Sequence, residues 1–197
     1  MTNTSKDWFP KSRLEALTDG IYAVALTLLV LDLKISAGQI GAAQLSQALF
    51  HQLPNLLTWL LSFWVILIFW ESQVRLSRLI DQIDTATLRL DLLHLGLISL
   101  LPFSTSLIGE HGDQRLAVLI YTLNLWVISA LSVMKIVHLG NTPDVLSINA
   151  DVSNYSRSAK LMLGGMTVAL LLSYVFPGWN LIALLAPKLI TRKKVAH

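Results

Sequence analysis

The 197-residue sequence contains no cysteine, and this absence excludes three kinds of chemistry together. Without thiols the chain can form no disulfide, no thiolate metal site and no cysteine nucleophile. Charged side chains are also scarce, at 14% of residues against about 25% in soluble globular domains. A soluble protein of this length needs more charge to cover its surface, so the composition argues against a soluble domain.

Sequence signatures of common enzymes and metal sites are missing as well. The five histidines do not stand at metal-ligand spacings, and the chain has no HExxH, GxSxG, P-loop or GxGxxG motif. The polar run Glu110-His111-Gly112-Asp113 lies in a short link between apolar blocks, where a solvated turn is the simpler interpretation. We therefore expect no enzymatic activity, no catalytic residue, no cofactor and no resident metal.

Long apolar blocks dominate the chain, which is 54% hydrophobic and has a mean hydropathy of +0.60. A bilayer core of about 30 Å takes about 20 helical residues, and lipid cannot satisfy open backbone groups. Each long block is therefore predicted to be a transmembrane helix, which gives an all-α polytopic membrane protein with a single domain over residues 1–197. The predicted spans are approximately 13–33, 53–70, 90–108, 116–137, 161–176 and 179–190. The sixth span is short, so we expect it to be tilted, extended, or flanked by thinned lipid.

Lysine and arginine are distributed unevenly between the two ends of these spans. With six spans, 13 of the 15 fall on the side that holds both termini, and only Lys34 and Arg115 fall on the other side. The positive-inside rule then predicts that both termini are cytoplasmic. Because the net charge of +3 is explained by topology, we expect a lipid bilayer and no nucleic acid as the partner.

Several polar or ionisable side chains fall near the ends of the predicted spans. We interpret Glu15, Glu71 and Asp91 as interfacial, because snorkelling lowers the cost of a charge near the end of a span. Gln73 lies at a similar depth.

Asp19 lies deeper in the first span and needs a partner inside the protein. Ionisable groups at membrane depth are costly and are candidates for function. The candidate partners are Arg13, Thr18, His94 and Asn124, which with Asp19 form a predicted polar network. For His94 a packing role is the simpler interpretation, and a proton relay is the alternative.

The first predicted span has one purely aliphatic face. At 100° per residue, Val24, Leu28 and Leu31 form a narrow stripe, and Asp19 and Glu15 point to the opposite side. From periodicity alone, the simpler interpretation is a packing face against lipid or a neighbouring helix.

Three segments of the chain resemble a known family. The first span has Arg13, Leu17, Thr18 and Asp19, followed by Gly20, Ala23, Ala25, Thr27, Leu28 and Leu29. This pattern is similar to R-x-x-x-F-S-D followed by G-x-x-A-x-A-x-T-L-L, which marks the first helix of the transmembrane protein 175 family. The run Phe69-Trp70 resembles the end of that family's second helix, and Leu100–Glu110 resembles its third helix and the exit from it. The sequence departs from the pattern at two places: Leu17-Thr18 stands for Phe-Ser, and Ser72-Gln73 stands where the family often has a histidine.

The resemblance implies a potassium-permeable channel, since the family consists of such channels, lysosomal in animals and present also in prokaryotes. It implies that the first helix lines the pore of a homotetramer, with a constriction of large aliphatic residues at Val24, Leu28 and Leu31 and with Thr27 beside it. The only metal expected is the transient potassium ion. Val24 is smaller than the family's usual residue, so the narrowest ring is expected at Leu28 or Leu31. The expected location is the plasma (inner) membrane of a prokaryote.

Two other functions remain open on the sequence. A secondary transporter or proton-coupled carrier would use Asp19 and His94, and transporters commonly show inverted repeats and broken helices. A membrane scaffold would carry no flux at all. Flux measurements separate these alternatives from a channel.

Overall fold

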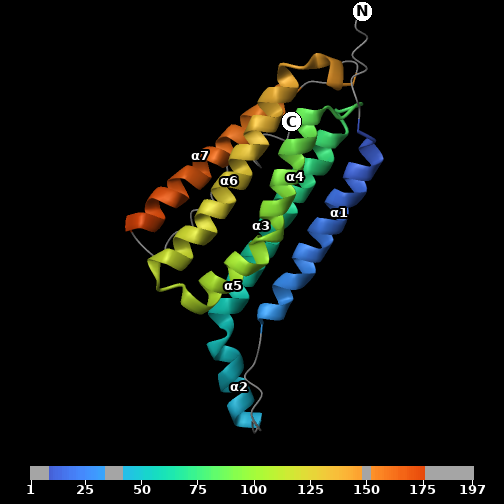
Figure 1. The fold of residues 1–197 in the computed structure, drawn as a ribbon. Helices are drawn as coiled ribbons and strands as arrows, with labels where there is room; N and C mark the ends of the chain where they lie inside the picture. The colour runs from blue at the N-terminus through green and yellow to red at the C-terminus, as the bar shows by residue number, and fades with distance from the viewer. Residues whose placement is uncertain (1–8, 34–41, 148–151, 176–197) are drawn as a thin grey trace, which may run out of the picture.

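Helices form the regular structure of the chain (Figure 1). The computed structural model describes residues 9–33, 42–147 and 152–175. In chain order the elements are α1 (Lys11–Leu28), the short 3-10 helix η1 (Leu29–Asp32), α2 (Ala42–His51), α3 (Leu53–Ser77), α4 (Thr85–Ser99), α5 (Leu101–His111), α6 (Arg115–Gly140), the 3-10 helix η2 (Pro143–Val145) and α7 (Ser153–Val175). Within these ranges only two isolated β-bridges accompany the helices, which confirms the all-α class there.

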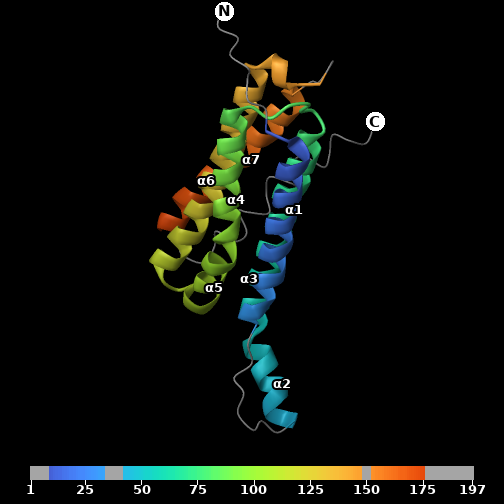
Figure 2. The same ribbon diagram turned by 45° about the vertical axis from the view of Figure 1, so that its right-hand side comes forward.

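The long helices alternate in direction through an up-and-down bundle (Figures 1 and 2). The start of α1, the α3–α4 link and the α6–α7 link lie at one end, and the α5–α6 turn lies at the other. In the described ranges, Arg115 alone among the lysines and arginines begins a helix at the second end. The rest belong to the first end, which we call the cationic end: Lys11, Arg13, Arg75, Arg78, Arg89, Lys135, Arg157 and Lys160.

Four stretches of the described chain are long and apolar enough to cross a bilayer. They are Lys11–Leu31, Leu53–Ser77, Thr85–His111 and Arg115–Gly140, and they overlap the first four predicted spans. The helix α7 covers most of the fifth predicted span, and the sixth, 179–190, lies outside the described residues. The protein is therefore a multi-pass membrane protein.

The third spanning stretch is two helices, because the chain breaks between α4 and α5. Pro102 has no backbone N–H, so it cannot donate the helical hydrogen bond to the carbonyl four residues earlier. Asn124 on α6 supports the break: its Nδ2 lies 3.4 Å from the Leu97 carbonyl and 3.4 Å from Ser104 Oγ. Broken helices are tolerated at membrane depth when neighbouring side chains satisfy the backbone in this way.

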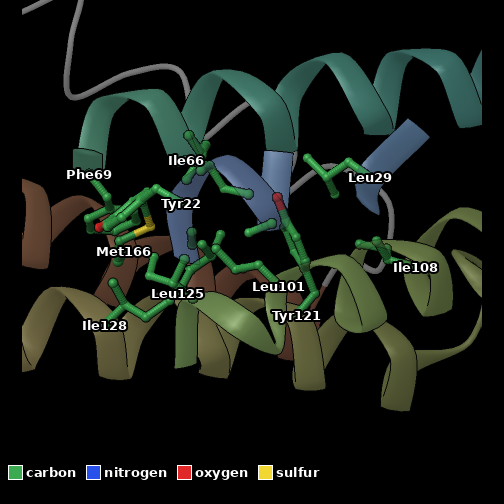
Figure 3. Close-up of a cluster of buried hydrophobic side chains, with 14 of the residues drawn as sticks. Tyr22, Leu29, Ile66, Phe69, Leu101, Ile108, Tyr121, Leu125, Ile128 and Met166 are labelled. Atoms are coloured by element: carbon green, nitrogen blue, oxygen red, sulfur yellow. The ribbon is translucent and has the colours of Figure 1, made fainter. Parts of the chain in front are cut away.

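The core of the bundle is built around α6, which packs against α4, α5 and α7. Figure 3 shows Tyr121, Leu125 and Ile128 from α6 against Tyr22 of α1 and Phe69 of α3. The buried Tyr121 hydroxyl lies 3.0 Å from Ser62 Oγ, so the polar tip of this residue is satisfied. In lipid such contacts stabilise by close packing and interhelical hydrogen bonds rather than by removal of water.

The loop before α4 carries a titratable helix cap at the cationic end. Asp84 Oδ1 accepts a hydrogen bond from the Thr87 N–H (2.9 Å), and Oδ2 lies 2.9 Å from His138 Nε2 on α6. Partial burial raises the pKa of Asp84, but the hydrogen bonds from Thr87 and His138 lower it, and the resulting pKa lies below the ordinary 3.8. The carboxylate form therefore joins α4 to the end of α6.

The lowered pKa of Asp84 predicts a pH-dependent stability. A group whose pKa is lower in the folded state stabilises the fold at pH values above 3.8, and this contribution is lost as the pH falls below that value. We expect the unfolding temperature of the detergent-solubilised protein to fall less steeply below pH 3.8 in Asp84→Asn than in the wild type. Asp113→Asn, in the exposed α5–α6 turn, should keep the wild-type slope. Equal slopes for the Asp84 variant and the wild type would contradict the assignment.

Candidate functional site

The helix α1 presents two different faces. Leu14, Tyr22 and Ala25 are buried against the bundle, and Leu29 continues this face in η1. The predicted stripe lies on the other side: Val24, Leu28 and Leu31 are 55%, 42% and 60% exposed in the single chain. The stripe therefore does not belong to the core of its own subunit and is free to meet lipid or another chain.

Three hydrogen bonds fix the bundle face of α1 to its neighbours. Ser77 Oγ on α3 donates to Glu15 Oε1 (2.6 Å). Trp70 Nε1 on α3 donates to Asp19 Oδ1 (2.9 Å), and Tyr22 Oη lies 2.8 Å from His94 Nε2 on α4. Residues four and three apart lie on one side of a helix, so these contacts hold α1 with its aliphatic stripe turned outward.

Asp19 is hydrogen-bonded as predicted, but its partner is a residue that the sequence analysis did not consider. The candidates were Arg13, Thr18, His94 and Asn124, and the structure provides Trp70 instead. Thr18 lines the same cavity as Asp19, and Arg13 is exposed at the start of the helix. Trp70 reaches Asp19 because the end of α3 runs beside the start of α1 (Figure 2).

The predicted network divides into separate sites, since His94 and Asn124 lie away from Asp19. His94 is buried, bonds to Tyr22 and packs edge-on against Phe69 at a centroid distance of 5.9 Å. Within the described residues its Nδ1 has no hydrogen-bond partner. Asn124 serves the α4–α5 break. The prediction of a single polar network around Asp19 is therefore wrong. His94 bonds to Tyr22 on α1, Asn124 lies against the end of α4, and Asp19 bonds to Trp70 on α3.

A cavity of about 160 Å³ opens beside α1 at the cationic end. Its polar lining includes Asp19, Thr18 and Glu15 from α1 and an ion pair from α4 and α6. Lys135 Nζ donates to Asp91 Oδ1 (2.6 Å), Asp91 Oδ2 (2.9 Å) and Gln73 Oε1 (3.0 Å). The ammonium group therefore bonds to both carboxylate oxygens of Asp91 and to the side-chain carbonyl of Gln73.

The interfacial interpretation of Asp91 is wrong, because its side chain is only 7% exposed and that of Lys135 only 5%. The sequence analysis counted Lys135 only as a topology signal. The positions of the two residues in their helices could have indicated the ion pair. Asp91 is six residues after the start of α4, and Lys135 is five residues before the end of α6. If the two helices are antiparallel neighbours, these positions lie at the same depth. Glu71 behaves as an interfacial residue, since it pairs with Arg75 on the surface of the same helix.

The hydroxyl of Thr27 forms a hydrogen bond within its own helix. Its Oγ1 donates to the Val24 carbonyl at 2.9 Å, and the side chain is exposed. Because the hydroxyl proton is used, the oxygen faces outward as an acceptor with free lone pairs.

The hydrogen bond from Trp70 to Asp19 gives a prediction about α1. Trp70→Phe removes the N–H donor and should lower the free energy of unfolding by about 1 kcal/mol, with α1 loosened from α3. Trp59→Phe is the matched control, because Trp59 Nε1 is buried without a hydrogen-bond partner in the described chain. Thermal unfolding in detergent compares the two variants. A larger loss in the Trp59 variant would show that the donor does not matter.

Comparison with known proteins shows a likeness to one family. The sequence model of the family described as "Endosomal/lysosomal potassium channel TMEM175" matches residues 13–102. The chain is 35% identical over 113 residues to a potassium channel of Chamaesiphon minutus, covering 55% of this chain and 56% of the relative. It is 34% identical over 99 residues to a potassium channel of Streptomyces collinus, covering 50% and 48%. The match thus spans about half the length of these curated relatives.

The structural likeness extends over nearly the whole chain. The crystal structure of a lysosomal potassium-selective channel TMEM175 homolog from Chamaesiphon minutus superposes with a TM-score of 0.81 and 25% sequence identity. The superposition covers 94% of this chain and 98% of that chain. The helical arrangement described above is therefore shared with that channel.

Proposed function

Because the chain resembles the TMEM175 family in sequence and in fold, we propose that it is a potassium-permeable cation channel. The names of the relatives and of the matching structure support this proposal. The observation that carries it is the outward position of the aliphatic stripe on α1, opposite the face that three hydrogen bonds fix to the bundle.

One chain cannot enclose a pore with a single helix, so the proposed channel is a homotetramer. Closed cyclic symmetry brings the same face of each copy to one axis. Four copies of Val24, Leu28 and Leu31 then form aliphatic rings that stop ions by dewetting and open when the rings widen enough to hold water. Thr27 places an acceptor oxygen close to Val24 and can offset part of an ion's lost hydration. The permeant potassium is cargo, and no resident metal or cofactor is required.

Reconstitution into liposomes tests the proposal. Purified protein should carry potassium passively, with a reversal potential that follows the potassium gradient. Flux coupled to a proton or sodium gradient would identify a transporter, and no flux in a properly assembled protein would identify a scaffold. Either result would reject the channel.

We also propose that the cationic end faces the cytoplasm, with both termini on that side. The charge asymmetry between the two ends of the bundle supports this orientation. Reporter fusions at His197 and within the α5–α6 turn should report opposite sides of the membrane. The same side for both fusions would reject the six-span arrangement.

A further inference from the structure

The helices α2 and α3 together form a rod that is longer than a bilayer core is thick. Gln52, between them, keeps helical dihedral angles, and the N–H groups of Gln52 and Leu56 bond to the carbonyls of Ala48 and Gln52. From Ala42 to Ser77 the two helices together contain roughly 54 Å of helical rise at 1.5 Å per residue, with Pro54 in the first turn of α3. Both ribbon views show α2 continuing past the α5–α6 turn, away from the cationic end (Figures 1 and 2).

The hydrocarbon core does not reach α2. The first charged residue of the rod is Glu71, which marks the cationic boundary. One crossing of the hydrocarbon core takes about 20 helical residues. Counted back from Glu71, such a crossing ends near His51, the last residue of α2. The whole of α2 therefore stands outside the lipid tails.

The projecting helix nevertheless carries an apolar ridge. Leu45 and Leu49 lie one turn apart and are exposed, and the neighbouring Phe50 is 72% exposed. The same ridge continues along α3 through Leu53 and Leu57. An apolar surface of this kind beyond the bilayer marks an interaction site.

The membrane surface is a poor partner for this ridge. A helix that binds the lipid interface lies in its plane and carries lysine and arginine on its polar face. The segment from residue 35 to residue 70 contains no Lys, Arg, Asp or Glu, and α2 follows the direction of α3 out of the bundle. An uncharged ridge fits a surface that is itself uncharged.

We infer that the ridge formed by Leu45, Leu49 and Phe50 docks against α2 of a second copy of this chain. This inference rests on the proposed tetramer, because α3 packs beside α1 and α1 carries the stripe that would face the symmetry axis. Because α2 follows α3, the symmetry also brings the α2 helices of the different copies near the axis. The ridge of each copy then meets the identical, uncharged ridge of another copy. The copies form a collar of α2 helices around the outer mouth of the pore.

Single-cysteine crosslinking tests the collar directly, because the native chain has no cysteine. Leu49→Cys places a thiol on the ridge, and Gln47→Cys places one on the side of the same helix opposite Leu45 and Leu49. In membranes a short bis-maleimide should link Leu49→Cys chains into dimers about tenfold or more faster than Gln47→Cys chains. Measurable linking of both variants at equal rates would overturn the inference.

A second measurement covers the case in which the thiols lie too far apart to be bridged. Leu49→Asp should shift the assembled wild-type oligomer toward smaller species by about tenfold or more, while Gln47→Asp should not. Native mass measurement separates the outcomes. An oligomer that both variants leave intact rejects the collar and leaves the channel, whereas a monomeric wild type rejects both. A fluorophore on Leu49→Cys that is strongly quenched by brominated lipid places the ridge in the membrane and also rejects the collar.

Discussion

Replacing Leu28 with Asn is expected to raise cation flux by about tenfold or more and to weaken the preference for potassium over sodium. Leu28 is 42% exposed on the outward face of α1, so in the proposed tetramer four copies form one of the aliphatic rings. An amide in each of four chains would hold water in the ring and lower the dewetting barrier. Each 1.36 kcal/mol removed from a barrier multiplies the rate about tenfold. Even a small reduction of the free-energy barrier from dewetting therefore gives a large change in flux. Potassium flux into liposomes, with sodium as competitor, measures both effects.

Val30→Asn is the matched control for this substitution. Val30 is 50% exposed in η1, but it lies off the stripe formed by Val24, Leu28 and Leu31. The control should disturb local packing without hydrating the pore. Leu31→Asn should act like Leu28→Asn, since Leu31 shares the stripe. If both stripe variants keep wild-type flux and selectivity in an assembled tetramer, α1 does not form the gate.

The orientation of α1 was predictable because helical periodicity needs only local sequence. The position of Asp19 and Glu15 opposite Val24, Leu28 and Leu31 follows from 100° per residue, and the structure has the acids hydrogen-bonded to α3 and the stripe exposed. The partner of Asp19 was not predictable in the same way. Its identity depends on the rotation and depth of α3, which brings an indole N–H of Trp70 within 2.9 Å.

The long-range polar contacts were the part that the sequence did not disclose. Asn124 was placed in the network of Asp19 because both are polar and intramembrane. Its Nδ2 instead lies 3.4 Å from the Leu97 carbonyl near the end of α4, a contact that depends on how α6 packs against the break between α4 and α5. The same limit applies to Asp91, since distance from a span end suggested an interface and only the antiparallel contact of α4 with α6 reveals the ion pair.

The ion pair between Asp91 and Lys135 should dominate the stability of the cationic end. Lys135→Met leaves the Asp91 carboxylate buried without its counter-charge, and breaking a buried pair in this way costs about 3–5 kcal/mol. Arg75→Met, which removes the cation of a surface pair on α3, should cost about 1 kcal/mol or less. Unfolding of the detergent-solubilised variants measures both free energies.

The double variant Asp91→Leu with Lys135→Met separates two explanations for the loss in Lys135→Met. Either the ion pair itself adds net stability, or the loss comes only from leaving one buried charge unpaired. Exchanging a buried ion pair for apolar side chains is often neutral or stabilising, because the cost of dehydrating two charges disappears with them. We therefore expect the double variant to regain most of the stability lost in Lys135→Met, and Gln73 to be left as the one polar side chain needing a new partner at this site. A loss equal to the sum of the two single variants would show that the side chains act independently.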